Sequence, residues 1–255
     1  MARAWHWTGR RLPRGRLDAL RQLGLVALAY ILYRIVRGLV FEGGAGPAFE
    51  NARLLVDIER SMGLFFEPGL QAWTLATSPV IATVASWIYV NSHFVITSSF
   101  LVWLYMRRNQ SFNVVRDAFM ISMGLALAGY LLFPTAPPRM MPEWGFTDSV
   151  VELVGSAASK GAETLYNPYA AVPSMHVAFA LLVGIPASRL VDKRVFKVAW
   201  AAYPVLVTFV VVVTANHFWL DAALGALVAA FSAWVALTAQ SAALARERVA
   251  IEATA

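Results

Sequence analysis

The sequence contains no cysteine and only four histidines, and charged residues make up only 14% of its 255 positions. Without cysteine, disulfide bonds, thiol nucleophiles and thiolate metal sites are excluded, and cysteine usage gives no indication of the redox compartment. The chain also lacks an internal repeat, a low-complexity tract and a Gly-rich phosphate-binding loop. Its chemistry must therefore be carried by a small number of polar side chains.

Hydrophobic residues, by contrast, make up 59% of the chain. They fall in blocks of about 20, the length of helix that crosses a ~30 Å hydrocarbon core. We predict an all-α polytopic membrane protein, a six-transmembrane-helix bundle with amphipathic helices on its outer face. The predicted spans are Leu20–Val40, Pro79–Met106, Val114–Phe133, Val172–Leu190, Val195–Val213 and His217–Leu237. We expect one catalytic domain over 20–239, between a basic cytoplasmic tail over 1–19 and a cytoplasmic C-terminal tail over 240–255.

The net charge of +6 does not indicate nucleic-acid binding, because of where the basic residues lie. They gather before the first predicted span and after the second, fourth and sixth spans, which is one side of the membrane if six spans alternate. The loops on the other side hold only Arg53, Arg60, Arg139 and Lys160. The positive-inside rule then places both termini of a multi-pass cell-membrane protein in the cytoplasm. The first span has no cleavage site before it and is expected to be an uncleaved anchor.

A segment after the Gly- and Pro-rich residues 42–48 has amphipathic character. Leu54, Ile58 and Met62 recur every four residues, opposite charged side chains. This spacing predicts a helix that lies flat on the outer membrane face, either shaping a lipid entrance or simply packing on the bundle. Residues 150–154 form a shorter apolar stretch that could be one more interfacial helix.

Two polar residues at the start of the last predicted span carry the strongest chemical signal. His217 and Asp221 stand four residues apart, so they share a face if this segment is helical. Asp221 could then accept a hydrogen bond from one ring nitrogen of His217, which would leave the other nitrogen free to attack phosphorus. A His-x3-Asp pair alone is weak evidence, and a purely structural role is the alternative.

Ser174 and His176 follow Pro173, which we expect at the first turn of the fourth span. Unpaired backbone N–H groups and the helix dipole favour an anion there. Ser174 could donate to a phosphoryl oxygen, and a protonated His176 could act as general acid for the leaving oxygen. The alternative is a capping serine and an interfacial histidine.

Arg139 lies on the outer loop directly after Pro137 and Pro138. Its planar guanidinium matches phosphate geometry and would stabilise charge on the equatorial oxygens during transfer. Two histidines and one arginine, each in a motif, thus fall on the same predicted side of the membrane. This coincidence favours a phosphate-handling site over three unrelated surface residues.

These residues resemble the type-2 phosphatidic acid phosphatase superfamily of six-span lipid phosphatases and phosphotransferases. Its three motifs read Lys-x6-Arg-Pro, Pro-Ser-Gly-His and Ser-Arg-x5-His-x3-Asp. The matching residues are Pro173, Ser174 and His176 in the second motif, with Met175 in place of glycine, and His217 and Asp221 in the third. The resemblance covers roughly residues 79 to 237.

The resemblance implies a role for each matched residue. His217 would be the nucleophile that forms a phosphohistidine, Asp221 its orienting partner and His176 the general acid. Ser174 and Arg139 would bind the phosphate, and neither a metal nor another cofactor would be needed.

The chain also departs from the family pattern. Leu132 stands in place of the lysine of the first motif and Met140 in place of its proline, while Val210 and Val211 replace Ser-Arg of the third. Two cationic ligands are missing, which favours a singly charged phosphodiester over a monoester. The Phe-Pro-Thr-Ala-Pro-Pro stretch at 133–138 looks most like the inositol phosphorylceramide synthase branch, whose members transfer a phosphoinositol headgroup between lipids.

Other polar residues in apolar surroundings are possible contributors to a substrate pocket. Asn91 and His93 lie in the second span, and Asn216 precedes His217. Arg34 and Arg37 lie near the outer end of the first span, where they could supply positive charge or snorkel to headgroups. For Asn91 and His93 the alternative is structural hydrogen bonding.

We therefore predict a membrane enzyme that acts on a phospholipid headgroup at the extracytoplasmic face, with phosphodiester transfer ahead of lipid phosphate monoester or polyprenyl pyrophosphate hydrolysis. The expected partners are membrane lipids and not nucleic acid, and the sequence does not reveal the oligomeric state. A lipid transporter or scramblase is the non-enzyme alternative, because intramembrane polar residues are expected there as well.

Overall fold

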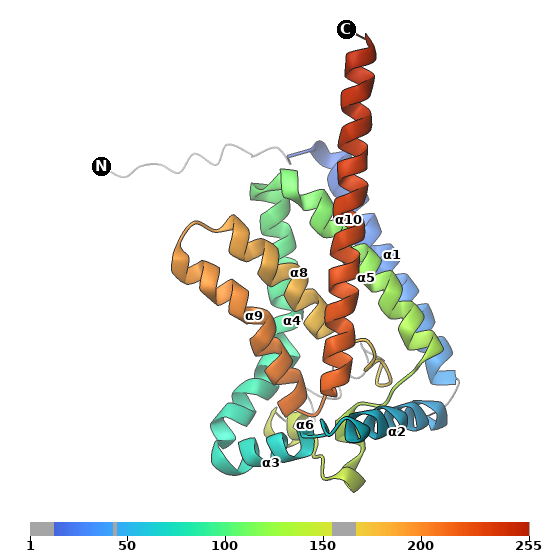
Figure 1. Ribbon diagram of the computed structural model, residues 1–255, viewed down its shortest axis with the longest axis vertical. Helices are drawn as coiled ribbons and strands as arrows, with labels where there is room; N and C mark the ends of the chain where they lie inside the picture. The colour runs from blue at the N-terminus through green and yellow to red at the C-terminus, as the bar shows by residue number, and fades with distance from the viewer. Residues whose placement is uncertain (1–12, 43–44, 155–166, 255) are drawn as a thin grey trace.

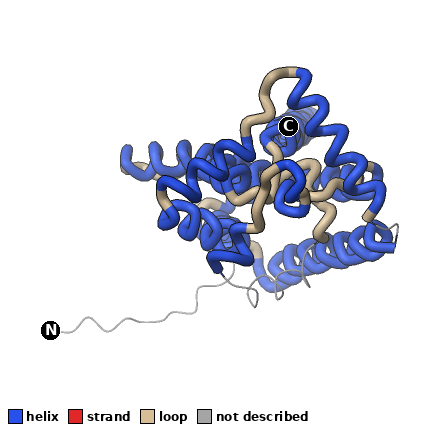
Figure 2. The backbone as a smooth tube through the Cα atoms, turned by 90° about the horizontal axis from the view of Figure 1, so that it is seen from below, coloured by secondary structure: helices blue, strands red, loops and turns tan. Residues whose placement is uncertain are grey.

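The computed structural model describes residues 13–42, 45–154 and 167–254, and it is built from helices (Figure 1). The predicted all-α fold is confirmed. No strand occurs in the described ranges (Figure 2), and the one β-type contact there is an isolated bridge between Thr135 and Ala170. Most of the predicted basic tail, residues 1–12, lies outside the described residues.

The helices follow one another with short connections. In chain order they are α1 (Gly15–Glu42), α2 (Gly46–Ser61), α3 (Glu67–Thr77), α4 (Pro79–Arg107), α5 (Asn109–Leu132), the 3₁₀ turns η1 (Pro138–Met140) and η2 (Pro142–Trp144), α6 (Ser149–Val154), α8 (Met175–Leu190), α9 (Arg194–Val213) and α10 (Trp219–Thr254).

Within the described residues, five helices are long and apolar enough to cross a membrane: α1, α4, α5, α9 and α10. The helix predicted as the fourth span, α8, is apolar but has only 16 residues. At 1.5 Å per residue it is about 24 Å long, shorter than a ~30 Å hydrocarbon core. Five of the six predicted spans are thus supported by length and composition, and the sixth stays a prediction.

Two helices begin a few residues later than expected, so that motif residues expected inside them lie just before them. The fourth span was expected from Val172, but α8 begins at Met175, because Ser174 is in an extended conformation. Pro173 therefore precedes the helix instead of occupying its first turn. The last helix was expected from His217, but α10 begins at Trp219 and continues to Thr254, well past Leu237.

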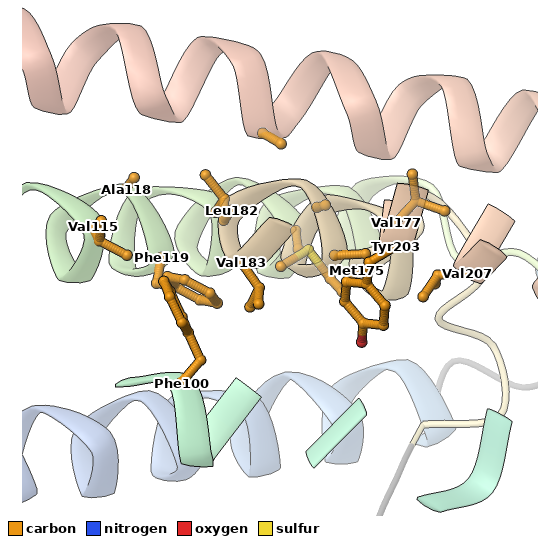
Figure 3. Packing of buried hydrophobic residues seen from close by; sticks show 14 of the residues in the cluster. Phe100, Val115, Ala118, Phe119, Met175, Val177, Leu182, Val183, Tyr203 and Val207 are labelled. Carbon is orange, nitrogen blue, oxygen red and sulfur yellow. The ribbon is translucent and has the colours of Figure 1, made fainter. Parts of the chain in front are cut away.

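The core of the bundle is formed where α8 packs against α5, α9 and α10, with α4 beside it (Figure 3). Phe100 of α4, Phe119 of α5, Val183 of α8 and Val207 of α9 meet in one cluster of buried side chains. Large apolar side chains on the outward faces are exposed, as expected for helices surrounded by lipid.

Helices α2, α3 and α6 lie at one end of the bundle, and the start of α1 and the end of α10 lie at the other (Figure 1). The helix predicted over residues 54–62 exists as α2, and it packs inward through Ala48, Ala52 and their neighbours. The Leu54, Ile58 and Met62 stripe is left exposed. The short apolar stretch after residue 149 is also helical, as α6, and packs against α4.

Candidate functional site

His217 lies in the turn between α9 and α10 and is only 4% exposed. The turn is closed by the carbonyl oxygen of Val211, which accepts hydrogen bonds from the backbone N–H groups of Asn216 and His217, each at 3.0 Å. Ala215, between the two helices, has a left-handed conformation with φ of 53°. The sequence therefore turns sharply here, and the turn, not a helix, positions the His217 ring.

The His217 ring is held at its Nδ1 atom. Nδ1 is 3.0 Å from the carbonyl oxygen of Ala171 and 3.4 Å from Oδ2 of Asp221. A carbonyl oxygen can only accept a hydrogen bond, so Nδ1 carries the proton. In the neutral ring the Nε2 lone pair is then free.

The expected pairing of His217 with Asp221 is present, but its basis differs from the prediction. His217 precedes α10, so the two residues do not share a helix face. Asp221 is fully buried, and its Oδ2 also accepts a hydrogen bond from the backbone N–H of Phe218 at 2.9 Å. The shortest contact of Nδ1 is with a backbone carbonyl, which no side-chain pattern in the sequence could reveal.

His176 lies in the first turn of α8, close to two other histidines. The centroid of its ring is 5.5 Å from that of His217 and 4.5 Å from that of His93, and it stacks on Tyr89 at 4.7 Å. His93 in turn stacks on Phe179. Three of the four histidines of the chain therefore meet in one cluster.

The structure separates His93 from its predicted companion Asn91. The Asn91 side chain donates to the carbonyl oxygen of Trp87 in its own helix, which is the structural role given as the alternative. His93, by contrast, contacts the site directly.

Ser174 is fully buried, and its hydroxyl has no hydrogen-bond partner among the described atoms. Its backbone N–H donates to the carbonyl oxygen of Asp221 at 3.0 Å, which joins the start of α8 to α10. This close approach depends on Gly225 of α10, where an added Cβ would lie 2.2 Å from the carbonyl oxygen of Ser174. At Gly129 of α5, an added Cβ would likewise lie too close, 2.8 Å from Cδ of Pro173.

Arg139, on η1, is tied to the turn that carries His217. Its backbone N–H donates to the carbonyl oxygen of Ala215 at 2.7 Å, and its Nη1 donates to Oδ1 of Asn216. Its Nε lies 3.5 Å from Oδ2 of Asp148, and its side chain is only 7% exposed. The structure therefore brings Arg139 and Asn216 together on the turn that carries His217.

The remaining predicted contributors, Arg34 and Arg37, lie on α1. Arg34 lies on an exposed face of α1, where its Nη1 is 3.5 Å from the Tyr30 hydroxyl, and Arg37 is half-buried on the same helix. At the positions where the family motifs have cations, Leu132 is 81% exposed and Val211 is fully buried. Among residues 13–42, 45–154 and 167–254, no group of three or more His, Cys, Asp or Glu side chains is arranged to hold a metal ion.

The sequence analysis missed two acidic residues, Glu59 of α2 and Glu67 of α3. Both are fully buried, and each accepts a hydrogen bond from the first turn of α10. Glu59 could have been noticed, because a glutamate on the buried face of an amphipathic helix is unusual. The sequence does not indicate, however, which group it contacts.

A family model described as the PAP2 superfamily matches residues 53–235, which is more than half of the chain. The chain belongs to the PAP2 superfamily. The match covers Arg139, Ser174, His176, His217 and Asp221. It does not reach Arg34 or Arg37. No curated protein and no solved structure matches the chain. The resemblance seen in the motifs is thus confirmed at the level of the superfamily, which indicates phosphatase or phosphotransferase chemistry, and no finding identifies a branch within it.

Proposed function

We propose that this protein is a lipid phosphotransferase or phosphatase that acts on a phospholipid headgroup through a phosphohistidine intermediate. The observation that carries the proposal is the position of His217 Nδ1 between two acceptors, the Ala171 carbonyl oxygen and Asp221 Oδ2. This arrangement supplies a nucleophilic Nε2 next to a second histidine, as superfamily membership leads us to expect.

In the first step, Nε2 of His217 attacks phosphorus, so that an N–P bond forms as the bond from phosphorus to the leaving oxygen breaks. His176, in its protonated form, gives its proton to that oxygen. Asp221, held by the backbone N–H of Phe218, stabilises the positive charge that develops on the His217 ring. In the second step, the oxygen of water or of a lipid hydroxyl attacks phosphorus, so that a P–O bond forms as the N–P bond to His217 breaks, and neutral His176 takes up the proton of the attacking group.

Ser174 and Arg139 would bind the phosphate. The unpaired, buried Ser174 hydroxyl is a donor without a partner, and such a group is costly unless a ligand satisfies it. Arg139 is held rigidly by Asn216 and Ala215, and rigid donors stabilise a transition state without reorganising.

A phosphodiester is the substrate class that these charges favour. Arg139 is the only basic residue in the three motifs, and part of its charge is balanced by Asp148 at 3.5 Å. A monoester carries up to two negative charges and would need more cations than the motifs supply. A phosphodiester headgroup donor, as in the inositol phosphorylceramide synthase branch, is therefore preferred over phosphatidic acid.

We place the site at the extracytoplasmic face of the cell membrane, with both chain termini in the cytoplasm. The distribution of basic residues supports this orientation. The bundle geometry is consistent with it, because the start of α1 and the end of α10 lie at the end opposite α2 and α3 (Figure 1).

The test compares two lipids with the purified protein in detergent micelles. Phosphatidylinositol, a diester, should show a higher kcat/KM than phosphatidic acid, a monoester, and mass spectrometry should identify the released or transferred headgroup. A clear preference for phosphatidic acid or a polyprenyl pyrophosphate would indicate that the protein is a phosphatase and not a transferase. Absence of turnover on every lipid would favour a transporter.

A further inference from the structure

The start of α10 is held by acidic side chains from three different elements. Its first backbone N–H groups donate to carboxyl oxygens at distances of 2.9, 3.1 and 3.2 Å. The pairs are Phe218 with Asp221 Oδ2, Trp219 with Glu67 Oε1, and Leu220 with Glu59 Oε1. Helix N-termini favour negative charge, so the carboxyl groups stabilise this turn. The same turn positions His217 one residue before Phe218.

Glu59 and Glu67 form a buried pair of carboxyl groups. Both are 0% exposed, and their Oε2 atoms have no donor among the described residues. Their Oε1 atoms accept from the backbone N–H groups of two neighbouring residues, Trp219 and Leu220, so both carboxyl groups lie against the same turn. Two buried carboxylates in such an arrangement repel each other, which favours the protonated form of Glu59.

The electrostatics at Glu59 agree with a protonated carboxyl group. Burial raises the pKa of Glu59 to about 9, and the negative charge of the Glu67 carboxylate adds to this effect. The charged groups that act on the Glu59 carboxyl are Glu67 from α3 and Asp221 from α10, and all carry the same sign. Loss of the proton would place two repelling carboxylates against the turn that holds His217 and Asp221.

We propose that Glu59 and Glu67 are positioning residues for the phosphoryl-transfer site: by accepting hydrogen bonds from Leu220 and Trp219, they keep the first turn of α10, and with it His217, in its reactive place. The inference rests on the proposed function of His217. It gives α2 and α3 a role in the reaction, although neither helix contributes a group that touches the substrate.

Glutamine tests the role of the proton, because its amide NH₂ replaces the donor of the protonated carboxyl group while its carbonyl oxygen still accepts from Leu220. Turnover of phosphatidylinositol by wild-type protein should be steady to about pH 8 and fall severalfold by about pH 10, as Glu59 loses its proton. Glu59→Gln should keep turnover within about twofold at pH 7.5 and lose this alkaline decline. Glu59→Ala should lower kcat roughly tenfold or more with little change in KM.

The matched control is Glu50→Gln, since Glu50 lies on the same helix but is exposed. It should reproduce the wild-type pH profile. If Glu59→Gln declines at alkaline pH as the wild type does, or if folded Glu59→Ala keeps the wild-type kcat, the positioning role is refuted.

An infrared measurement separates this inference from the proposed function. Wild-type protein at pH 7.5 should show a protonated carboxyl band that is missing in Glu59→Gln, because glutamine carries no carboxyl proton. An identical band in both proteins would refute a protonated Glu59. If His217→Ala kept its turnover, by contrast, the proposed function would fail while the infrared result still tested the pair.

Discussion

The two ends of the helical bundle are built on different principles. At the end with α2 and α3, hydrogen bonds join segments far apart in the chain, such as Trp219 with Glu67 and His217 with Ala171. At the other end, α5, α8 and α10 surround a cavity of about 580 Å³ lined mainly by aliphatic side chains, including Val115, Leu182 and Ala229. One end depends on individual atoms in fixed places, and the other needs only apolar volume.

This difference predicts where substitutions should have large effects. A polar network fails when a single partner is removed, because the remaining groups stay buried and unpaired. An apolar region around a cavity loses or gains contacts gradually. The predictions below test this contrast, beginning with the largest expected effect.

Replacing His217 should have the largest effect. His217→Ala removes the proposed nucleophile and should lower kcat by about 10³-fold or more, while Asp221→Asn should lower it by about 10²-fold, because the cationic ring loses its counter-charge. Turnover of phosphatidylinositol by detergent-purified protein is the measurement, with lipid binding as the control for folding. Near-normal turnover by His217→Ala would contradict the mechanism.

Gly225→Ala should have the next largest effect, although the change adds only one methyl group. The new Cβ would meet the backbone carbonyl oxygen of Ser174 at 2.2 Å, and a backbone cannot move away as a flexible side chain can. Displacing Ser174 would disturb the phosphate site, so kcat/KM should fall by at least about tenfold.

The matched control for this change is Gly124→Ala on α5, where the added Cβ meets nothing within 4 Å. It should leave activity unchanged and slightly favour the helix, by up to about 1 kcal/mol. Equal activity of the two variants would show that the contact between α8 and α10 is not needed for the site.

The contrast between the two ends also explains what could be predicted from the sequence. Blocks of apolar residues specify membrane helices by length and composition alone, and five of the predicted spans have that character in the structure. The sixth, α8, is shorter than predicted, because hydropathy does not show that Ser174 is extended. Composition was sufficient where only apolar volume matters.

At the other end, the sequence predicted the residue types but not the contacts. The spacing of His217 and Asp221 indicated a pair, and the pair exists through a turn that the spacing did not predict. The Ala171 carbonyl oxygen, Glu59 and Glu67 were missed, because their partners are backbone groups brought close only by folding. Predicting them would require knowing how α2 and α3 dock on α10.

A smaller effect is expected on the pH dependence of stability. The pKa of Glu59 is about 9 in the folded protein, against 4.5 for an ordinary glutamate, so the folded state retains a proton that the unfolded chain releases. This contribution to stability is complete below about pH 4.5 and is lost as the pH rises towards 9, by at most about 1.4 kcal/mol per pH unit.

The measurement is thermal unfolding in detergent, followed by tryptophan fluorescence at pH 6 and pH 8.5. The Tm of wild-type protein should fall by several degrees between the two values, and that of Glu59→Gln should fall less, because glutamine does not titrate. Glu50→Gln should behave as the wild type does. Parallel curves for wild type and Glu59→Gln would show that Glu59 is ionised in the folded state.

The smallest effect is expected from one substitution in the cavity. Ala233 lines the cavity on α10. It lies three turns, roughly 18 Å, along the helix from Asp221. Ala233→Leu adds apolar atoms to unfilled space, so the free energy of unfolding should change by less than about 1 kcal/mol and turnover by less than about twofold.

The same substitution near the other end of α10 provides the comparison. Ala222 is only 3% exposed and lies directly after Asp221. It does not line the cavity between α5, α8 and α10. Leucine there should displace Asp221 and lower turnover at least about tenfold, since overpacking a filled core shifts the backbone. If Ala233→Leu lowered turnover as much as Ala222→Leu, the two ends of the bundle would be equally sensitive to substitution. The cavity itself would then have a part in the reaction.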